Sequence, residues 1–254
     1  MSEVLRADNL AVQFGGVRAV DGLSLTIDQG ELIGLIGPNG AGKTTALRLL
    51  TGILKSDSGR VFLAGADVTR FPVHRRARLG LASTHQIVRP FPGISALENV
   101  VVAAGHVRTR GAFSALGSTS RMPERRRAME LLDLLGLASV SKMRADRLPL
   151  GQLKRLEVAR ALALDPQIIL LDEPLAGLNT EEAGALSETI LSLNRAGLTV
   201  VLIEHNLGEV LRISRRLVVL VGGRVVADGE PATTVLEPVV QDAYVGTEDD
   251  HAAA

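Results

Sequence analysis

The sequence predicts an α/β fold with a mixed β core, an antiparallel β subdomain and an all-helical insert. The apolar run Leu32–Ile36 leads into a glycine-rich loop and then a helix, as in a buried parallel strand with its crossover. A second apolar run, 168–171, ends in two acidic residues. Between the two runs, apolar side chains over residues 87–164 recur at helical rather than alternating spacing. This order of patterns is typical of an α/β domain with helices inserted into it.

We expect a single domain over residues 1–254. Its expected parts are a core with the β subdomain at 1–86 and 165–246, a helical subdomain at 87–164, and a flexible tail at 247–254.

The loop Gly37–Thr45 matches the phosphate-loop pattern GxxxxGK[ST] at every fixed position. Backbone N–H groups must wrap a phosphate chain, and glycine lets the backbone approach the phosphate closely. Lys43 is expected to reach the β- and γ-phosphates, and the Thr44 hydroxyl is expected to ligate Mg²⁺. An ordinary glycine-rich turn is the alternative, which the flanking strand and helix disfavour. The expected nucleotide contacts are Gly37, Pro38, Asn39, Gly40, Ala41, Gly42, Lys43, Thr44 and Thr45.

Composition excludes several classes of function. Lys+Arg and Asp+Glu both number 28, so the chain lacks the basic surplus that is typical of nucleic-acid-binding proteins. Aromatic residues are 2% of the chain, which argues against a base-stacking platform. The chain has no cysteine, so it has no disulfide. No apolar run approaches the ~20 residues of a membrane span and no signal peptide is evident, so we expect a cytoplasmic protein that reaches a membrane through a partner.

Two alternating segments near the N-terminus, 10–14 and 23–27, predict half-buried strands. Phe14 ends the first segment, and on this pattern alone a core aromatic is the simpler interpretation. In the insert, Ser95 and Glu98 form a capping box that predicts a helix to about Ala104. Residues 105–121 are rich in Gly, Ser, Thr and Arg and predict a mobile loop.

The acids Asp172 and Glu173 follow a buried strand, at the sheet edge where a phosphate-loop protein holds Mg²⁺. Adjacent strand residues point in opposite directions, so both carboxylates cannot face the metal. The simplest division assigns Asp172 to Mg²⁺, through water, and Glu173 to the attacking water. A solvent-facing acidic pair is the alternative.

His205 and Gln86 also end predicted strands. Alone, each has a simple structural interpretation: a hydrogen-bonded histidine and a loop glutamine. With the phosphate loop and the acidic pair, however, four strand ends present polar groups at one edge of one sheet. That clustering is typical of an α/β active site.

Over nearly its whole length the chain resembles an ATP-binding-cassette (ABC) ATPase, an ABC-type P-loop NTPase. Residues 37–45 match the Walker A loop, 168–173 the Walker B strand with its glutamate, Gln86 the Q-loop and His205 the switch histidine. The resemblance implies Glu173, His205 and Gln86 as catalytic residues, and Thr44, Gln86 and Asp172 as the Mg²⁺ site. It also implies that Phe14 stacks on adenine. The signature loop, which contacts ATP on a partner subunit in this family, falls on Leu148, Pro149, Leu150, Gly151 and Gln152, and the D-loop contains Asn179.

Several local sequences are similar to the ATPases of branched-chain amino acid importers. They are the segments 14–17, 86–91, 176–179, 203–206 and 243–246. The related urea and amide importers are close alternatives. Lipopolysaccharide-export ATPases are also similar, although the glycine-rich segment 105–121 suits the importers better.

The signature loop departs from the family pattern at two positions, with Pro149 for serine and Leu150 for glycine. Pro149 has neither a hydroxyl nor an N–H, so a charge-assisted bond worth ~1.5–3 kcal/mol is missing, a factor of roughly 10 to 100. The N–H of Gly151 and the helix dipole remain. Asn179 replaces the usual D-loop aspartate, and His85 stands where the importer group usually has phenylalanine.

The resemblance implies ATP hydrolysis that powers an importer, with ATP and Mg²⁺ as cofactors. The implied partners are a second ATPase subunit, integral membrane permease subunits and, indirectly, an extracytoplasmic substrate-binding protein. The irregular signature favours a different chain as the second ATPase, although a homodimer is possible. The implied location is the inner face of the plasma membrane. A weakly hydrolysing regulatory module is the alternative of another class, and a DNA-repair or translation ATPase is disfavoured by zero net charge.

Overall fold

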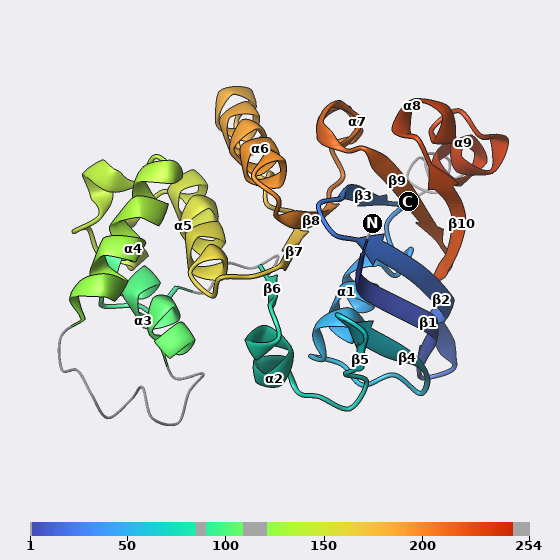
Figure 1. The fold of residues 1–254 in the computed structure, drawn as a ribbon. Coiled ribbons are helices and arrows are strands. Elements are labelled where there is room, and N and C mark those ends of the chain that lie inside the picture. The colour runs from blue at the N-terminus through green and yellow to red at the C-terminus, as the bar shows by residue number, and fades with distance from the viewer. Residues whose placement is uncertain (1, 85–89, 109–120, 246–254) are drawn as a thin grey trace.

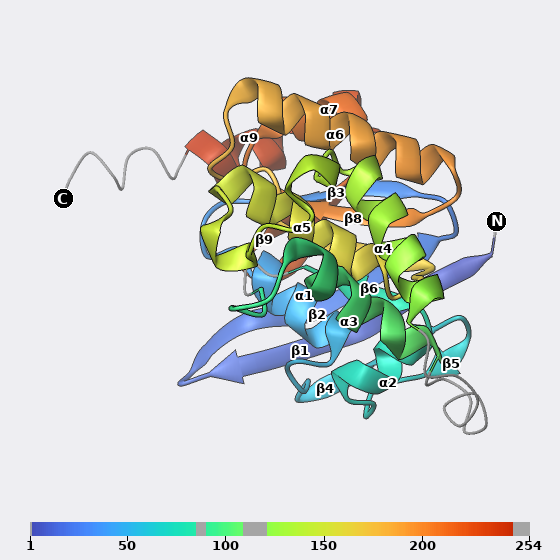
Figure 2. The same cartoon turned by 90° about the vertical axis from the view of Figure 1, so that its left-hand side faces the viewer.

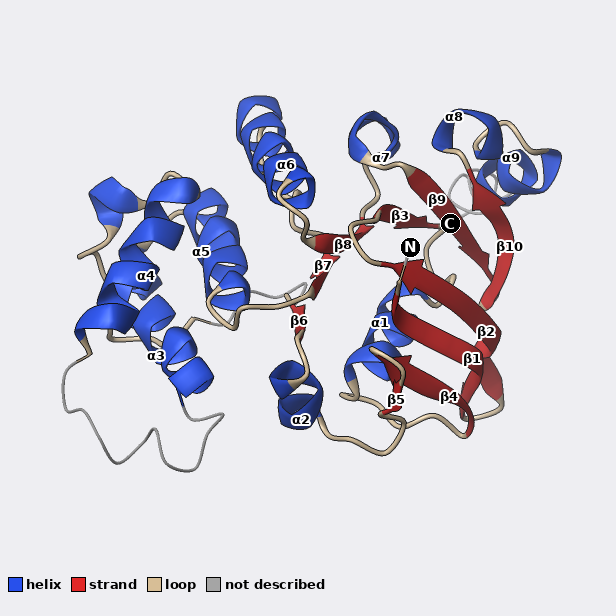
Figure 3. Ribbon diagram, in the orientation of Figure 1, coloured by secondary structure: helices blue, strands red, loops and turns tan. Residues whose placement is uncertain are grey.

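The computed structural model describes residues 2–84, 90–108 and 121–245. The predicted α/β class is confirmed: two sheets share the chain with a helical part (Figure 1, Figure 3). Within the described residues, every secondary-structure element between Ala96 and Leu162 is a helix. No helix of these residues is both long and apolar enough to cross a membrane.

The first sheet has four antiparallel strands in the order β2-β1-β4-β5. Their bounds are β1 Glu3–Phe14, β2 Val17–Asp28, β4 Ser58–Leu63 and β5 Ala66–Asp67. Gly59 lies inside β4 at φ 87°, and a Cβ there would be 2.3 Å from the carbonyl oxygen of Asn9. Close approach of the neighbouring strand therefore explains this glycine, although Asp57, Ser58 and Gly59 together have the sequence of a hairpin turn.

The second sheet has six strands in the order β10-β9-β3-β8-β7-β6, all parallel except β10. Their bounds are β3 Leu32–Ile36, β6 Leu81–Ser83, β7 Ile168–Asp172, β8 Thr199–Ile203, β9 Arg216–Val221 and β10 Arg224–Gly229. Parallel strands buried on both faces consist of near-continuous apolar runs, as β3, β7 and β8 do.

Alternate residues of this sheet belong to two different cores. In β3, Ile33 and Leu35 join the core that contains the antiparallel sheet and α1 (Lys43–Thr51). Leu32 and Ile36 join the core that contains the helical insert and α6 (Thr180–Arg195). The central sheet is therefore the layer that both halves of the molecule pack against.

The helical insert contains α3 (Ala96–Arg108), α4 (Met122–Leu134) and α5 (Leu150–Leu162), with short 3₁₀ turns before α5. Figure 2 looks onto these three helices, which lie in front of the sheets. The Ser95 hydroxyl and the Glu98 carboxylate cap α3 as the sequence predicts. The helix continues to Arg108 rather than ending near Ala104. The remainder of the predicted mobile loop, and the tail from 247, lie outside the described residues.

The remaining helices are short: α2 Val73–Arg78, α7 Leu207–Ile213, α8 Pro231–Thr234 and α9 Pro238–Val245.

Arg76 of α2 is a buried arginine, with 2% of its surface exposed. Its guanidinium donates to the carbonyls of Leu49 and Leu50 at the end of α1, at 2.8 and 2.6 Å. It also donates to the carbonyls of Phe71 and Thr69. Burial lowers its pKa to about 10.

We expect Arg76→Met to destabilise the protein by about 3 kcal/mol, because four carbonyls, two of them in buried contacts, lose the donor that Arg76 supplies. Thermal or urea unfolding followed by circular dichroism would measure this. Arg78→Met on the exposed face of the same helix is the control, and it should change stability by less than about 0.5 kcal/mol. If the two variants were equally stable, the hydrogen bonds from Arg76 to the end of α1 would contribute nothing to the free energy of unfolding.

Candidate active site

The phosphate loop lies between the end of β3 and the start of α1. Gly37, Gly40 and Gly42 all have positive φ, at 151°, 78° and 98°. Gly42 is the N-cap of α1, and no side chain caps that helix. The first turn of α1 therefore keeps backbone N–H groups for another partner, such as an anion.

The glycines of this loop are also required by the protein itself. A Cβ on Gly37 would lie 2.1 Å from the carbonyl oxygen of Leu220, and one on Gly42 would lie 2.3 Å from that of Ala19. Only at Gly40 is the neighbouring space open. The sequence argument, which explains all three glycines by phosphate approach, is therefore incomplete, because two of them also accommodate other strands of the fold.

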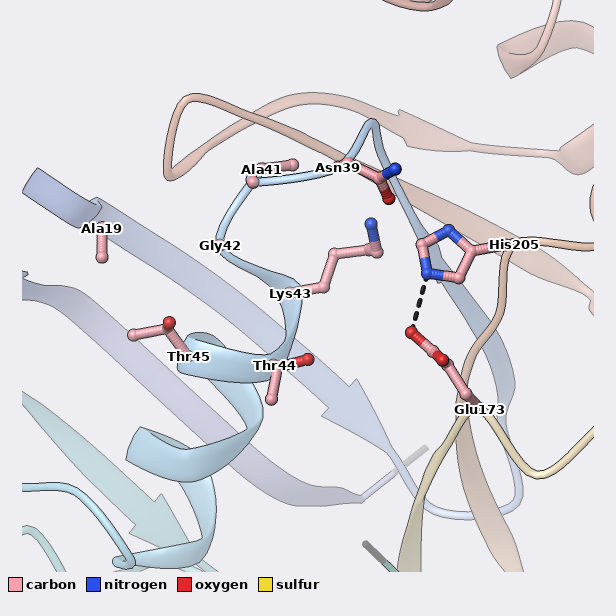
Figure 4. A pocket seen from close by; sticks show the side chains of 10 residues that line it. Ala19, Asn39, Ala41, Gly42, Lys43, Thr44, Thr45, Glu173 and His205 are labelled. Atoms are coloured by element: carbon pink, nitrogen blue, oxygen red, sulfur yellow. Dashed lines mark hydrogen bonds and ion pairs between the residues drawn. The ribbon is translucent and has the colours of Figure 1, made fainter. Parts of the chain in front are cut away.

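A pocket of about 270 Å³ lies over the loop (Figure 4). It is lined by Ala19, Asn39, Gly40, Ala41, Gly42, Lys43, Thr44, Thr45, Glu173 and His205. The structure thus brings residues from three strand ends of the central sheet into one pocket, together with Ala19 of β2. This is the edge at which ligands of open α/β sheets bind.

Lys43 is buried within the loop. Its Nζ donates to the carbonyl oxygens of Gly37, at 2.6 Å, and Pro38, at 3.0 Å. Burial lowers the pKa of Lys43, and the nearby carboxylates of Glu173 and Asp172 oppose that shift. The loop therefore holds one ammonium group at its centre.

Asp172 ends β7 and is 3% exposed. Its N–H donates to the hydroxyl of Thr84 at 3.1 Å, whereas its Oδ1 is buried without a hydrogen-bond partner. Burial, and then the charge of Glu173, raise the pKa of Asp172. A buried carboxylate oxygen without a partner is the kind of atom that a cation or an ordered water satisfies.

The described residues contain no group of three metal-ligating His, Cys, Asp or Glu side chains. Mg²⁺ does not require such a cage, since it commonly takes one or two protein oxygens together with waters and substrate phosphates. Asp172 and the Thr44 hydroxyl, which lies at the pocket, fit this kind of site.

Glu173 and His205 lie next to each other on the side of the pocket toward which Lys43 extends (Figure 4). The Nε2 of His205 and the Oε1 of Glu173 are 2.7 Å apart, and the Nε2–H tautomer donates this hydrogen bond. The Glu173 side chain is largely buried, and that of His205 is 47% exposed. Glu173 also has φ 49°, a left-handed conformation that is uncommon for a residue with a Cβ and that is found at functional sites.

Several other predicted site residues do not line this pocket or lie outside the described residues. Phe14 is 50% exposed at the end of β1, so its interpretation as a core aromatic is wrong, and it does not line the pocket. Gln86 and His85 lie outside the described residues. Leu148, Pro149, Leu150, Gly151 and Gln152 surround the start of α5, and none of them lines the pocket.

Near α5, the side chain of Leu150 is half exposed. A Cβ on Gly151 would be 2.7 Å from Oε1 of Glu182. Asn179 is the N-cap of α6, and its side chain accepts from the N–H of Glu182 at 2.8 Å. A threonine is also a common N-cap, but Thr180 is the first residue of that helix.

Three polar residues near the pocket are not found by motif reasoning: Thr84, Lys154 and Glu204. Glu204 had a signal in the sequence, because it directly precedes His205. Strand neighbours alternate in direction, so one of two adjacent polar residues there points into the protein. Glu204 is that residue, being 3% exposed.

Comparison with known proteins agrees with this site. Residues 20–176 match the family model described as ABC transporter. The chain belongs to the ABC transporter family. It is an ATP-binding ABC ATPase, and its mixed sheet, antiparallel sheet and helical part are those of an ABC cassette.

Among its relatives is a Pseudomonas aeruginosa protein named high-affinity branched-chain amino acid transport ATP-binding protein BraF. It is 37% identical, over 96% of this chain and 98% of the relative. The lipopolysaccharide export system ATP-binding protein LptB of Acidithiobacillus ferridurans is 35% identical, over 97% of this chain and 98% of the relative.

Two solved structures are also similar. The ADP conformation of MJ1267, an ATP-binding cassette of an ABC transporter, has a TM-score of 0.84 and 31% identity, covering 97% of this chain and 100% of that one. A dimeric post-hydrolysis cassette, MJ0796 bound to ADP and Pi, has a TM-score of 0.78 and 26% identity, covering 89% of this chain and 98% of that one.

The pKa of Glu204 generates a test of this buried group. Burial raises its pKa from 4.5 to about 7, against opposing hydrogen bonds from Leu175 and His205. The folded state therefore keeps a proton that the unfolded chain releases, and stability is lost as the pH rises from about 4.5 to about 7. Relative to Glu204→Gln, the wild-type ABC ATPase should lose up to about 3 kcal/mol of unfolding free energy over this range.

Urea unfolding of both proteins at several pH values would measure this difference. If their unfolding free energies run parallel from pH 4.5 to pH 7, the pKa of Glu204 is unshifted in the folded state.

Proposed function

We propose that this ABC ATPase powers an importer of branched-chain amino acids from the cytoplasmic face of the membrane. The observation that carries its chemistry is the Glu173–His205 contact of 2.7 Å in the same pocket as the phosphate loop. The substrate class is supported by the names of relatives such as BraF, which matches nearly end to end.

In the proposed mechanism, the phosphate loop binds ATP through its backbone N–H groups and Lys43. The Thr44 hydroxyl, Asp172, through water, and Gln86 would hold Mg²⁺, which would supply positive charge to neutralise the phosphates. Phe14 stacks on the adenine from the end of β1. The buried, unpartnered Oδ1 of Asp172 supports its part in this assignment.

Glu173 is the proposed general base. It orients the attacking water and accepts a proton from it as the water oxygen bonds to the γ-phosphorus and the bond to ADP breaks. His205, which already donates to Glu173 and is half exposed on the pocket side, contacts the γ-phosphate.

The signature residues Leu148–Gln152 and the D-loop Asn179 lie away from the chain's own pocket, which supports a role at the nucleotide of a second subunit. The similar cassette MJ0796 is dimeric in its structure bound to ADP and Pi. ATP would then bridge two subunits, and hydrolysis would reopen them. Because Pro149 removes two donors from the signature, we propose a different chain as the second ATPase.

The proposed membrane partners are permease subunits, with an extracytoplasmic binding protein acting through them. Their docking region includes residues 89–91 and 105–121. Phe91 is half exposed and lies under the guanidinium of Arg160, 4.8 Å from the ring centroid to Cζ. Lipopolysaccharide export is a second candidate, favoured by the 35% identity to LptB, and ATPase assays with each permease would separate the two.

Replacing Glu173 by Gln should lower kcat by roughly 100-fold or more while ATP binding is kept, because only the base is lost. Steady-state phosphate release and fluorescent-nucleotide titration would measure the two effects. Glu237→Gln, at an exposed acid, is the control. Wild-type turnover in the Glu173 variant would remove that residue from its proposed role, and tight binding without turnover in the wild type would favour a regulatory subunit.

The signature can be tested in the Glu173→Gln background. With Mg²⁺ and ATP, this variant should stay largely monomeric, and adding Pro149→Ser should tighten its dimerisation roughly 10- to 100-fold by restoring donors to phosphate. Sedimentation would report the dimer. Pro149→Ala restores the N–H alone and should give an intermediate result. A tight homodimer with Pro149 intact would contradict the proposal of a different partner chain.

A further inference from the structure

Glu204 is a buried carboxyl group that the proposed mechanism does not use. It follows β8 and does not line the nucleotide pocket. Its Oε1 accepts from the backbone N–H of Leu175 at 2.6 Å, and its Oε2 accepts from that of His205 at 3.3 Å. One carboxylate therefore connects the loop after Glu173 with the residue that contacts Glu173.

Lys154 reaches the same loop from α5. It lies one turn into α5, is 5% exposed, and donates from Nζ to the carbonyl oxygen of Glu173 at 2.7 Å. Its charge also acts on Glu204, lowering the pKa of that carboxyl against the effect of burial. A buried ammonium and a buried carboxyl group thus contact the same short loop.

Backbone hydrogen bonds also hold this loop, such as the one from the N–H of Ala176 to the carbonyl oxygen of Glu173 at 3.3 Å. The N–H of Glu173 donates to the carbonyl oxygen of Ile203 at 2.9 Å, and Pro174 has no N–H to donate. Glu173 has the left-handed φ of 49°, which is maintained only where the surroundings hold it. The bonds from Lys154 and to Glu204 add side-chain contacts that hold this part of the backbone.

We propose that Lys154 and Glu204 form a buried clamp, two positioning residues whose hydrogen bonds to the backbone hold the Glu173 carboxylate against His205. This inference rests on the proposed role of Glu173 as the base. Neither clamp residue lines the pocket, so the clamp acts on the hydrolytic step and leaves nucleotide binding to the phosphate loop.

The test compares pairs of variants at each position. Glu204→Leu and Lys154→Met remove the clamp contacts and should lower kcat roughly 10- to 100-fold with the KM for ATP changed less than about twofold. Lys154→Arg keeps a donor, and Glu204→Gln keeps one acceptor, so each should recover most of that loss. This recovery and the split between kcat and KM distinguish positioning from a general loss of folded protein.

A single charge left buried is destabilising, so the double variant Lys154→Met/Glu204→Leu is measured as well. It should fold, as judged by circular dichroism, and keep the low kcat. The matched control is the exposed pair Arg126–Glu130 on α4, whose side chains approach to 3.4 Å. Arg126→Met/Glu130→Leu should leave kcat unchanged.

Wild-type kcat in the folded double variant, beside an inactive Glu173→Gln, would overturn the clamp alone. Wild-type kcat in Glu173→Gln would overturn the proposed base and with it the basis of the clamp. A parallel rise of KM in the clamp variants would also overturn the proposal, because it would place these residues in nucleotide binding.

Discussion

The structure depends on the close contact between the phosphate loop and the strands around it. The carbonyl oxygens of Leu220 and Ala19 lie where side chains on Gly37 and Gly42 would be. The N–H of Gly223 donates to the carbonyl oxygen of Ala41 at 3.0 Å, so the turn after β9 also holds the loop. Both sheets thus shape one loop, and the way they pack on α1 decides where Lys43 and the pocket lie.

Much of the fold was predictable because buried parallel strands consist of apolar runs. β3, β7 and β8 each end where the sequence shows a functional residue, and neighbouring parallel strands bring those ends to one edge. Glu173 and His205 were therefore expected close together. Short-range patterns were less informative where tertiary contacts decide, as at Gly59, which resembles a turn residue and lies inside a strand.

The residues that sequence reasoning missed bind backbone groups rather than ligands. Lys154 is 19 positions from the carbonyl it contacts, and Glu204 is 29 positions from the N–H of Leu175. Lys154 precedes Arg155 in a charged stretch that resembles a surface position, and the partners of both residues are shown only by the fold. Phe14 illustrates the opposite error, since its alternating strand indicated burial, whereas the hairpin end at 14–17 leaves it half exposed.

Helix α5 exposes its first residue and makes a buried contact one turn later. Its first residue, Leu150, is half exposed, while Lys154, four residues later, holds the carbonyl of Glu173. Four residues of α-helix span only about 6 Å, and so short a piece of helix moves as a rigid rod. A second subunit that contacted Leu150 and shifted the start of α5 would therefore also shift the Lys154 ammonium. Helix α5 would in this way couple a contact at the subunit surface to the position of the buried Glu173.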